Sequence, residues 1–216
     1  MLWFFDLDGT LADTDADIRA SWKAAMADLG LVCETFDRDF IAGPPIDEMA
    51  RRLFGDIFTP DLAVRLRERF GFHYDSDGCP RTNEYPGVIA ACRRLKAMGD
   101  RLYIATNKRW EGAMALWNKF GWGEVFSALY TADMHRNDEI GKLSKASLLD
   151  LAMREAGVKS DDCVMVGDTI NDFTAANANS MRSIAVTWGY GTQDEFAHAS
   201  LKADSAEDLL ALRQRL

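Results

Sequence analysis

Short apolar runs alternate along most of the chain with longer segments whose apolar residues recur at helical spacing. The short runs predict buried strands over residues 2–5, 101–105, 128–131, 163–166 and 183–187. The longer segments predict helices over residues 88–98, 110–120, 145–156, 172–178 and 206–215. Strands that alternate with helices in this way indicate an α/β fold, with a parallel sheet covered by helices on both faces.

The segment 14–83 interrupts this alternation. Its apolar residues predict helices over 17–29, 46–54 and 61–72, and Gly43-Pro44-Pro45 predicts a turn between two of them. We therefore predict that residues 14–83 form a small helical domain. It is inserted into a core made of residues 1–13 and 84–216.

The composition adds constraints on partners and location. The 216 residues are 48% hydrophobic and 27% charged, which suits a protein that buries a sizeable core. The net charge of −9 disfavours nucleic acid and anionic membranes as partners, and a phosphate site would need a local cation. The scattered cysteines and the lack of a long apolar run lead us to expect free thiols, no membrane span and the cytoplasm.

Two aspartates, Asp6 and Asp8, directly follow the first predicted strand. Ligand sites of parallel sheets lie beyond the carboxyl ends of the strands, and alternation along the chain puts both carboxylates on one side. Carboxylates this close favour a bound cation, and Mg²⁺ prefers such oxygen ligands. The same residues also fit a solvated acidic turn.

Polar residues follow two further predicted strands. Thr106 and Asn107 come after strand 101–105, where they can bind phosphate oxygens or cap the next helix. Asp168 comes after strand 163–166, and Asp172 lies one helical turn later. These two acids can complete a metal site, or they can simply favour the start of a helix.

A lysine near the start of helix 145–156 can supply the positive charge. Helix starts favour negative charge, so a lysine there suits a role beside a carboxylate and a phosphoryl group, although most lysines are surface residues. Lys142 and Lys145 both qualify. We favour Lys145, because it leads directly into the apolar pattern of the helix.

These segments together resemble the haloacid-dehalogenase-like hydrolase superfamily. The matching segments are DLDGT (6–10), TNK (106–108), Lys145 and GDTIND (167–172). A narrower resemblance to its phosphoglycolate-phosphatase-like branch rests on residues 85–88, on 41–45 in the insert and on 187–191. The resemblance implies a Rossmann-like core with a mobile helical cap formed by 14–83. It also implies a phosphatase that acts on a small phosphorylated metabolite.

The resemblance implies the following roles. Asp6 attacks phosphorus, and Asp8 protonates the leaving alcohol and then activates water. Thr106 and Lys145 hold the phosphoryl oxygens. Mg²⁺ is bound by Asp6, Asp168 and the backbone carbonyl of Asp8, while Asp172 supports it from further out or through water. Further substrate contacts are expected from Gly9, Thr10, Asn107 and Lys108, and from Gly43 and Pro44 in the insert.

Several alternatives stay open. A phosphoglucomutase uses the same core, although Thr10 favours a phosphatase, and a nucleotidase or pyrophosphatase differs only in the leaving group. Phosphonate cleavage would need a cap lysine, for which the insert offers only Lys23. A binding protein that has lost the chemistry is disfavoured, because Asp6, Asp8 and the lysine are all present. The sequence is equally compatible with a monomer and with a homodimer.

Overall fold

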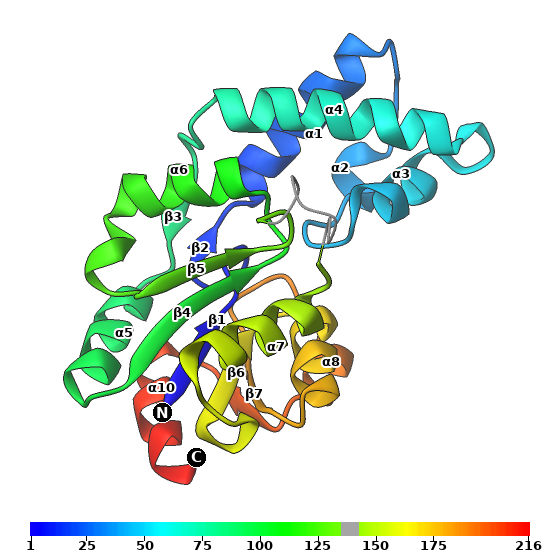
Figure 1. Cartoon of the computed structure of the whole chain (residues 1–216). Helices are drawn as coiled ribbons and strands as arrows, with labels where there is room; N and C mark the ends of the chain where they lie inside the picture. Colours follow the sequence, from blue (N-terminus) through cyan, green and yellow to red (C-terminus); the bar gives the residue numbers. More distant parts are fainter. Residues whose placement is uncertain (135–142) are drawn as a thin grey trace. The chain divides into compact units, whose positions relative to one another are not determined.

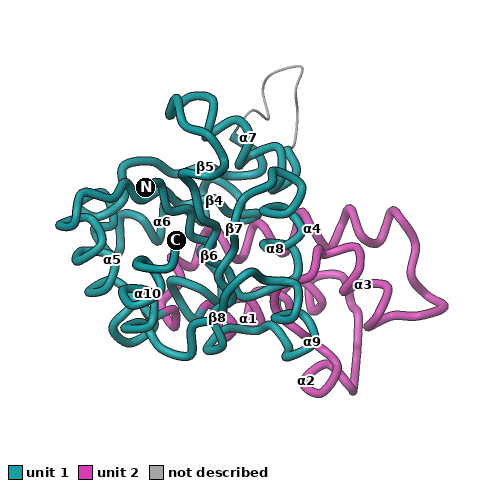
Figure 2. Tube along the Cα trace, turned by 90° about the horizontal axis from the view of Figure 1, so that it is seen from below, with its two compact units in different colours: residues 1–13, 83–216 teal, residues 14–82 magenta. Residues whose placement is uncertain are grey.

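The computed structural model describes residues 1–134 and 143–216. The chain forms two compact units, which Figure 2 shows in different colours. One unit consists of Met1–Asp13 and Asn83–Leu216, and the other of Thr14–Thr82. The larger unit contains a parallel sheet, and the smaller one is helical.

A six-stranded parallel sheet is the centre of the larger unit (Figure 1). Its strands lie in the order β5-β4-β1-β6-β7-β8. They are β1 Leu2–Phe5, β4 Arg101–Thr106, β5 Ala128–Thr131, β6 Cys163–Gly167, β7 Arg182–Val186 and β8 Leu201–Ala203. Every residue of β1 and β6 is buried, so these strands are apolar on both faces rather than alternating.

Helices and aromatic residues cover this sheet. The helices of the larger unit are α5 Val88–Ala97, α6 Trp110–Phe120, α7 Lys145–Ala156, α8 Ile170–Ala178, α9 Gln193–Phe196 and α10 Ala206–Leu212. On one face, Leu2 and Phe4 of β1 join a core cluster with Leu149 of α7. The alternate residues of β1 point to the opposite face, where the Phe5 ring lies 5.7 Å from the ring of Phe126. The core is therefore an α/β, Rossmann-like sheet.

The strand register brings polar residues to one edge of the sheet. Phe5 is paired with Ile104 on one side and with Val166 on the other. The next residue, Asp6, donates its backbone N–H to the carbonyl of Val166 at 2.9 Å. Asp6, Thr106 and Asp168 therefore all lie where their strands end, at the carboxyl edge of the sheet.

A short antiparallel pair lies where the chain leaves and re-enters the larger unit. It consists of β2 Ala12–Asp13 and β3 Asn83–Glu84, with Ala12 opposite Glu84. The buried Trp122 donates its indole N–H to Glu84 Oε1 at 2.7 Å. This bond holds β3 on the larger unit, next to the boundary between the two units.

The smaller unit contains α1 Asp15–Asp28, α2 Phe36–Asp39, α3 Ile46–Phe54 and α4 Pro60–Ser76. Its core is aromatic: the ring of Trp22 lies 5.6 Å from Phe40 and 6.1 Å from Phe70. Helix α4 begins with Pro60, and the Thr59 side chain caps it by accepting the N–H of Leu62 at 3.0 Å.

The predicted strands are all present, each within one residue of its expected bounds. The predicted end of helix 61–72 is wrong, because α4 continues to Ser76. The apolar pattern placed the end of the helix at Phe72, but Phe72 is exposed and the later Tyr74 is buried. The short elements β2, β3, β8, α2 and α9 were not predicted.

All four cysteines are free, as expected. None of the helices within residues 1–134 and 143–216 is long and apolar enough to cross a membrane.

A buried carboxylate in the smaller unit gives a test of its packing. Asp17 is only 2% exposed and accepts hydrogen bonds from the Thr82 hydroxyl (2.7 Å) and the Arg81 backbone N–H (3.0 Å). We predict that Asp17→Ala lowers the free energy of unfolding by about 3 kcal/mol, because it removes the buried carboxylate that accepts these hydrogen bonds. Urea denaturation measures the change.

The matched control is Glu68→Ala, at an exposed position of α4. Its free energy of unfolding should stay within about 0.5 kcal/mol of the wild-type value. Equal unfolding midpoints for the Asp17 and Glu68 variants would contradict the prediction.

Candidate active site

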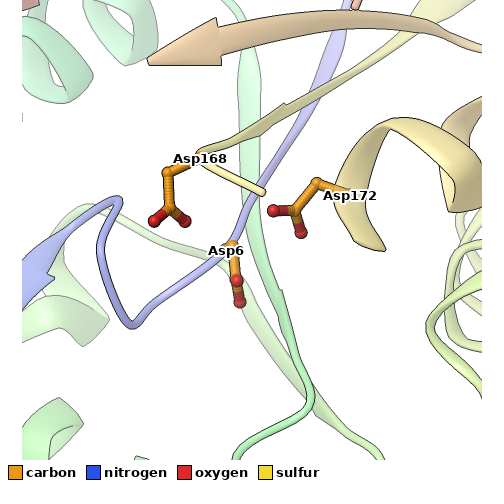
Figure 3. Close-up of side chains that lie close together, drawn as sticks. All are labelled: Asp6, Asp168 and Asp172. Carbon is orange, nitrogen blue, oxygen red and sulfur yellow. The ribbon is translucent and has the colours of Figure 1, made fainter. Parts of the chain in front are cut away.

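Three carboxylates converge at the carboxyl edge of the sheet (Figure 3). Asp6 follows β1, Asp168 follows β6, and Asp172 belongs to the first turn of α8. Each offers an oxygen atom, and these oxygens lie within 4.8 Å of one another. Asp168 and Asp172 are fully buried, and Asp6 is 8% exposed.

A helix cap fixes Asp172. Its Oδ2 accepts the backbone N–H of Thr169 at 3.1 Å, and the Thr169 side chain accepts the backbone N–H of Asp172 in return, which forms a capping box. The Thr169 hydroxyl also lies 3.2 Å from Asp172 Oδ2. The preceding Gly167 leaves the required space, because a Cβ there would lie 2.2 Å from Asp172 Cγ. The alternative reading of Asp172 as a helix-start residue is therefore correct, and it is compatible with a place in the acidic cluster.

Lys145 lies between two of these carboxylates. Its Nζ is 2.9 Å from Asp6 Oδ2 and 2.5 Å from Asp172 Oδ1, and its side chain is 4% exposed. It is the first residue of α7, which the Ser144 hydroxyl caps by accepting the N–H of Ser147 at 3.1 Å. Lys142, the other candidate, lies outside the described residues.

Burial and crowding shift the pKa values of the cluster. Burial raises the pKa of Asp6 to about 6; Lys145 opposes this shift and Asp172 adds to it. Burial, Asp172 and Asp6 raise the pKa of Asp168 well above its usual value. Burial alone would lower the pKa of Lys145, but the carboxylates of Asp172 and Asp6 outweigh it and raise that pKa. One lysine therefore faces three carboxylates, so the cluster favours a further cation.

The donor set fits a divalent metal ion. Among the described residues, the buried Asp6 Oδ1 has no hydrogen-bond partner, so this oxygen is left for a ligand. Carboxylate oxygens are the ligands that Mg²⁺ prefers. The buried cluster of Asp6, Asp168 and Asp172 could thus hold a metal ion.

The loop after β7 holds Asp168 in place. Asp168 Oδ2 accepts the backbone N–H of Tyr190 at 2.8 Å, and Oδ1 accepts the Thr10 hydroxyl at 3.1 Å. Glycines allow this close packing: a Cβ on Gly191 would lie 1.7 Å from the Asp168 carbonyl, and one on Gly189 would lie 2.2 Å from the Gly9 carbonyl. No place in the site was predicted for residues 187–191, although two glycines within three residues are typical of a close backbone approach.

Thr10 and Gly9, both predicted to bind substrate, contact Asp168. A Cβ on Gly9 would lie 2.1 Å from Asp168 Oδ2, and Gly9 has a φ of 78°. The backbone carbonyl of Thr10 accepts the indole N–H of Trp188 at 3.1 Å. These contacts place the loop after β1 against Asp168.

Thr106, Asn107 and Lys108 follow β4. The buried Thr106 Oγ1 accepts the backbone N–H of Lys108 at 3.2 Å, so its own hydrogen is directed elsewhere. Asn107 is exposed. The Lys108 ammonium, expected to bind substrate, lies 2.8 Å from Asp8 Oδ1. Asp8 and Asp6 thus contact different lysines.

The remaining predicted residues belong to the smaller unit. Gly43 and Pro44 lie just before α3, and Gly43 has a φ of 116°. The Lys23 ammonium lies 2.7 Å from Asp37 Oδ1 at an exposed position.

The sequence model of the haloacid dehalogenase-like hydrolase family matches residues 3–186. This chain belongs to that family. The matched range includes the three clustered aspartates and Lys145.

Similar proteins of known name indicate which branch of the family this chain resembles. A phosphoglycolate phosphatase from Agrobacterium fabrum is 34% identical over 193 residues, which cover 88% of this chain and 81% of the relative. A 5'-nucleotidase from Pseudomonas aeruginosa is 28% identical over 215 residues, which cover 98% of this chain and 93% of the nucleotidase. The crystal structure of a predicted phosphatase from Clostridium acetobutylicum has a TM-score of 0.86 at 25% identity, with 100% and 98% of the two chains covered. These similarities confirm the resemblance to the phosphoglycolate-phosphatase-like branch.

The raised pKa of Asp6 predicts a pH dependence of stability in the metal-free protein. The folded protein keeps a proton up to about pH 6, whereas the unfolded chain releases it near the ordinary value of 3.8. The free energy of unfolding should therefore fall as the pH rises through this window, by about 3 kcal/mol relative to Asp6→Asn, which lacks the group. Urea denaturation in EDTA at several pH values measures the difference. The prediction would be contradicted if the free energy of unfolding depended on pH in the same way in the wild-type protein and in Asp6→Asn.

Asp168 gives a separate test of metal binding. We expect Mg²⁺ to raise the melting temperature of the wild-type protein by several degrees, because only the folded state assembles the cluster. Asp168→Asn should lose this response, because the substitution removes one carboxylate of the cluster. Scanning calorimetry with and without Mg²⁺ tests both expectations. An unchanged Mg²⁺ response in the variant would place the metal elsewhere.

Proposed function

We propose that this protein is a Mg²⁺-dependent phosphatase that hydrolyses a small phosphorylated metabolite through an aspartyl-phosphate on Asp6. The observation that carries the proposal is the buried Asp6, bound to Lys145 at 2.9 Å and grouped with Asp168 and Asp172. A carboxylate held in this way beside a cation site suits nucleophilic attack on phosphorus, where negative charge must be neutralised.

The reaction has two steps. In the first, a carboxylate oxygen of Asp6 bonds to phosphorus, the bond from phosphorus to the alcohol oxygen breaks, and Asp8 gives its proton to that oxygen. In the second, Asp8 takes a proton from water, and the water oxygen attacks phosphorus. The bond between phosphorus and Asp6 then breaks, which releases phosphate and restores both aspartates.

The chain supplies groups for the charge that the phosphoryl group carries. Lys145 balances negative charge at Asp6, and the Thr106 hydroxyl can donate to a phosphoryl oxygen. Asn107 and the Gly9 backbone are proposed as further contacts of the phosphoryl group. Asp6, Asp168 and the carbonyl of Asp8 would hold Mg²⁺. When bound, the ion neutralises the carboxylates and stabilises charge on the transferred group.

The smaller unit, Thr14–Thr82, is proposed as the cap that selects the substrate, with Gly43 and Pro44 in its specificity loop. Phosphoglycolate or a similar phosphomonoester is the first candidate, supported by the 34% identical relative. A nucleoside monophosphate is the second, supported by the nucleotidase that matches 98% of the chain. Both suit a cytoplasmic enzyme that acts on free metabolites, as a monomer or homodimer.

A substrate screen tests this proposal. Purified protein is assayed for phosphate release from phosphoglycolate, nucleoside monophosphates and other phosphomonoesters, with Mg²⁺ and with EDTA. We expect Mg²⁺-dependent turnover that falls by at least about 10³-fold in Asp6→Asn, because the nucleophile is lost. The control Asp150→Asn, an exposed aspartate of α7 paired with Arg154, should keep wild-type activity. Turnover that persists in EDTA or in Asp6→Asn would refute the proposed mechanism.

A further inference from the structure

Lys108 and Asp8 form an ion pair beside the acidic cluster. Lys108 Nζ lies 2.8 Å from Asp8 Oδ1, and the side chains of Lys108 and Asp8 are only 6% and 21% exposed. An enclosed pair is less screened by water than a surface pair, so it orients its members more strongly. The contact is therefore a structural restraint on Asp8.

The backbone that carries Lys108 is itself fixed. Its N–H donates to Thr106 Oγ1 at 3.2 Å, at the end of β4. Two residues later, the Trp110 backbone N–H donates to Asp133 Oδ1 at 2.8 Å, and Asp133 also accepts the Thr131 hydroxyl at 3.1 Å. The loop between β4 and α6 is thus tied at both ends, and it presents the ammonium from a defined position.

The Asp8 backbone is equally defined. The N–H of Gly9 donates to the Ala12 carbonyl at 3.0 Å, and the N–H of Leu11 donates to the Leu7 carbonyl at 2.9 Å. This tight turn fixes the Cα of Asp8, but the side chain can still rotate. The ion pair with Lys108 restrains that remaining freedom.

We propose that Lys108 is a positioning residue that holds the Asp8 carboxylate in place as the proton acceptor for hydrolysis of the phosphoenzyme. The proposal rests on the proposed function. It assigns the two lysines different tasks: Lys145 contacts the nucleophile Asp6, and Lys108 contacts the proton-transfer residue Asp8. Proton transfer from water depends on such alignment.

Para-nitrophenyl phosphate separates this role from substrate binding. Its leaving group departs without a proton, so kcat/KM reports formation of the phosphoenzyme and kcat can report its hydrolysis. In Lys108→Met we expect kcat to fall by about 10- to 100-fold and KM to fall with it, so that kcat/KM stays within about threefold of wild type. Because hydrolysis becomes limiting, a burst of para-nitrophenol equivalent to the enzyme should precede the steady state.

Conservative and control variants complete the test. Lys108→Arg should recover most of kcat, whereas Lys119→Met, at an exposed position of α6, should behave as wild type. Adding Lys108→Met to Asp8→Asn should change kcat by less than about threefold, because both substitutions remove the same alignment. If Lys108→Met does not fold by circular dichroism, Lys108→Gln replaces it with the same expectations.

Two outcomes overturn the proposal. A fall in kcat/KM as large as that in kcat would make Lys108 a phosphate-binding residue, and unchanged kinetics would leave the ion pair without a role. The wild-type protein distinguishes these failures from failure of the proposed function. If it does not hydrolyse para-nitrophenyl phosphate in the presence of Mg²⁺, the phosphatase function itself is wrong, and this proposal falls with it.

Discussion

The ammonium group of Lys145 lies in the protein interior between Asp6 and Asp172, and the geometry of the site depends on this contact. A lysine that is 4% exposed is stable as a cation only when carboxylates compensate its lost hydration. In turn, Asp6 and Asp172 need that cation because they are buried beside Asp168. This arrangement leaves an excess of negative charge in the cluster, which favours a further cation there.

The parallel sheet makes this arrangement possible. Phe5 pairs with Ile104 on one side and with Val166 on the other. This register fixes the backbone positions of Asp6 and Asp168 at the ends of their strands. Close backbone packing then sets the side chains: Gly167 leaves room for Asp172, and Gly189 and Gly191 allow the loop after β7 to reach Asp168. The rigid sheet edge thus supplies positions, and the glycine-containing loops supply the fine placement that a reactive carboxylate requires.

Features that depend on residues close together in the sequence, such as strand ends, could be predicted from the sequence. Strand ends were predictable because apolar runs stop abruptly at Asp6 and Asp168, and parallel strands bring such ends to one edge. Periodicity favoured Lys145 but could not show that its ammonium reaches both Asp6 and Asp172, since that contact joins residues far apart in the chain. The pairing of Lys108 with Asp8 was missed for the same reason. Elements as short as β8 and α9 carry too few residues for a period to be recognised.

The proposed mechanism requires that Asp6 becomes phosphorylated, and this can be measured. Asp8→Asn protein is mixed with radiolabelled para-nitrophenyl phosphate and Mg²⁺ and quenched in acid, and the labelled peptide is identified. Without its proton acceptor the intermediate should accumulate, so the account predicts an acid-stable, hydroxylamine-sensitive label on Asp6 that is absent in EDTA. Phosphate release by the wild-type protein with no label on Asp6, or with the label on another residue, would contradict the account.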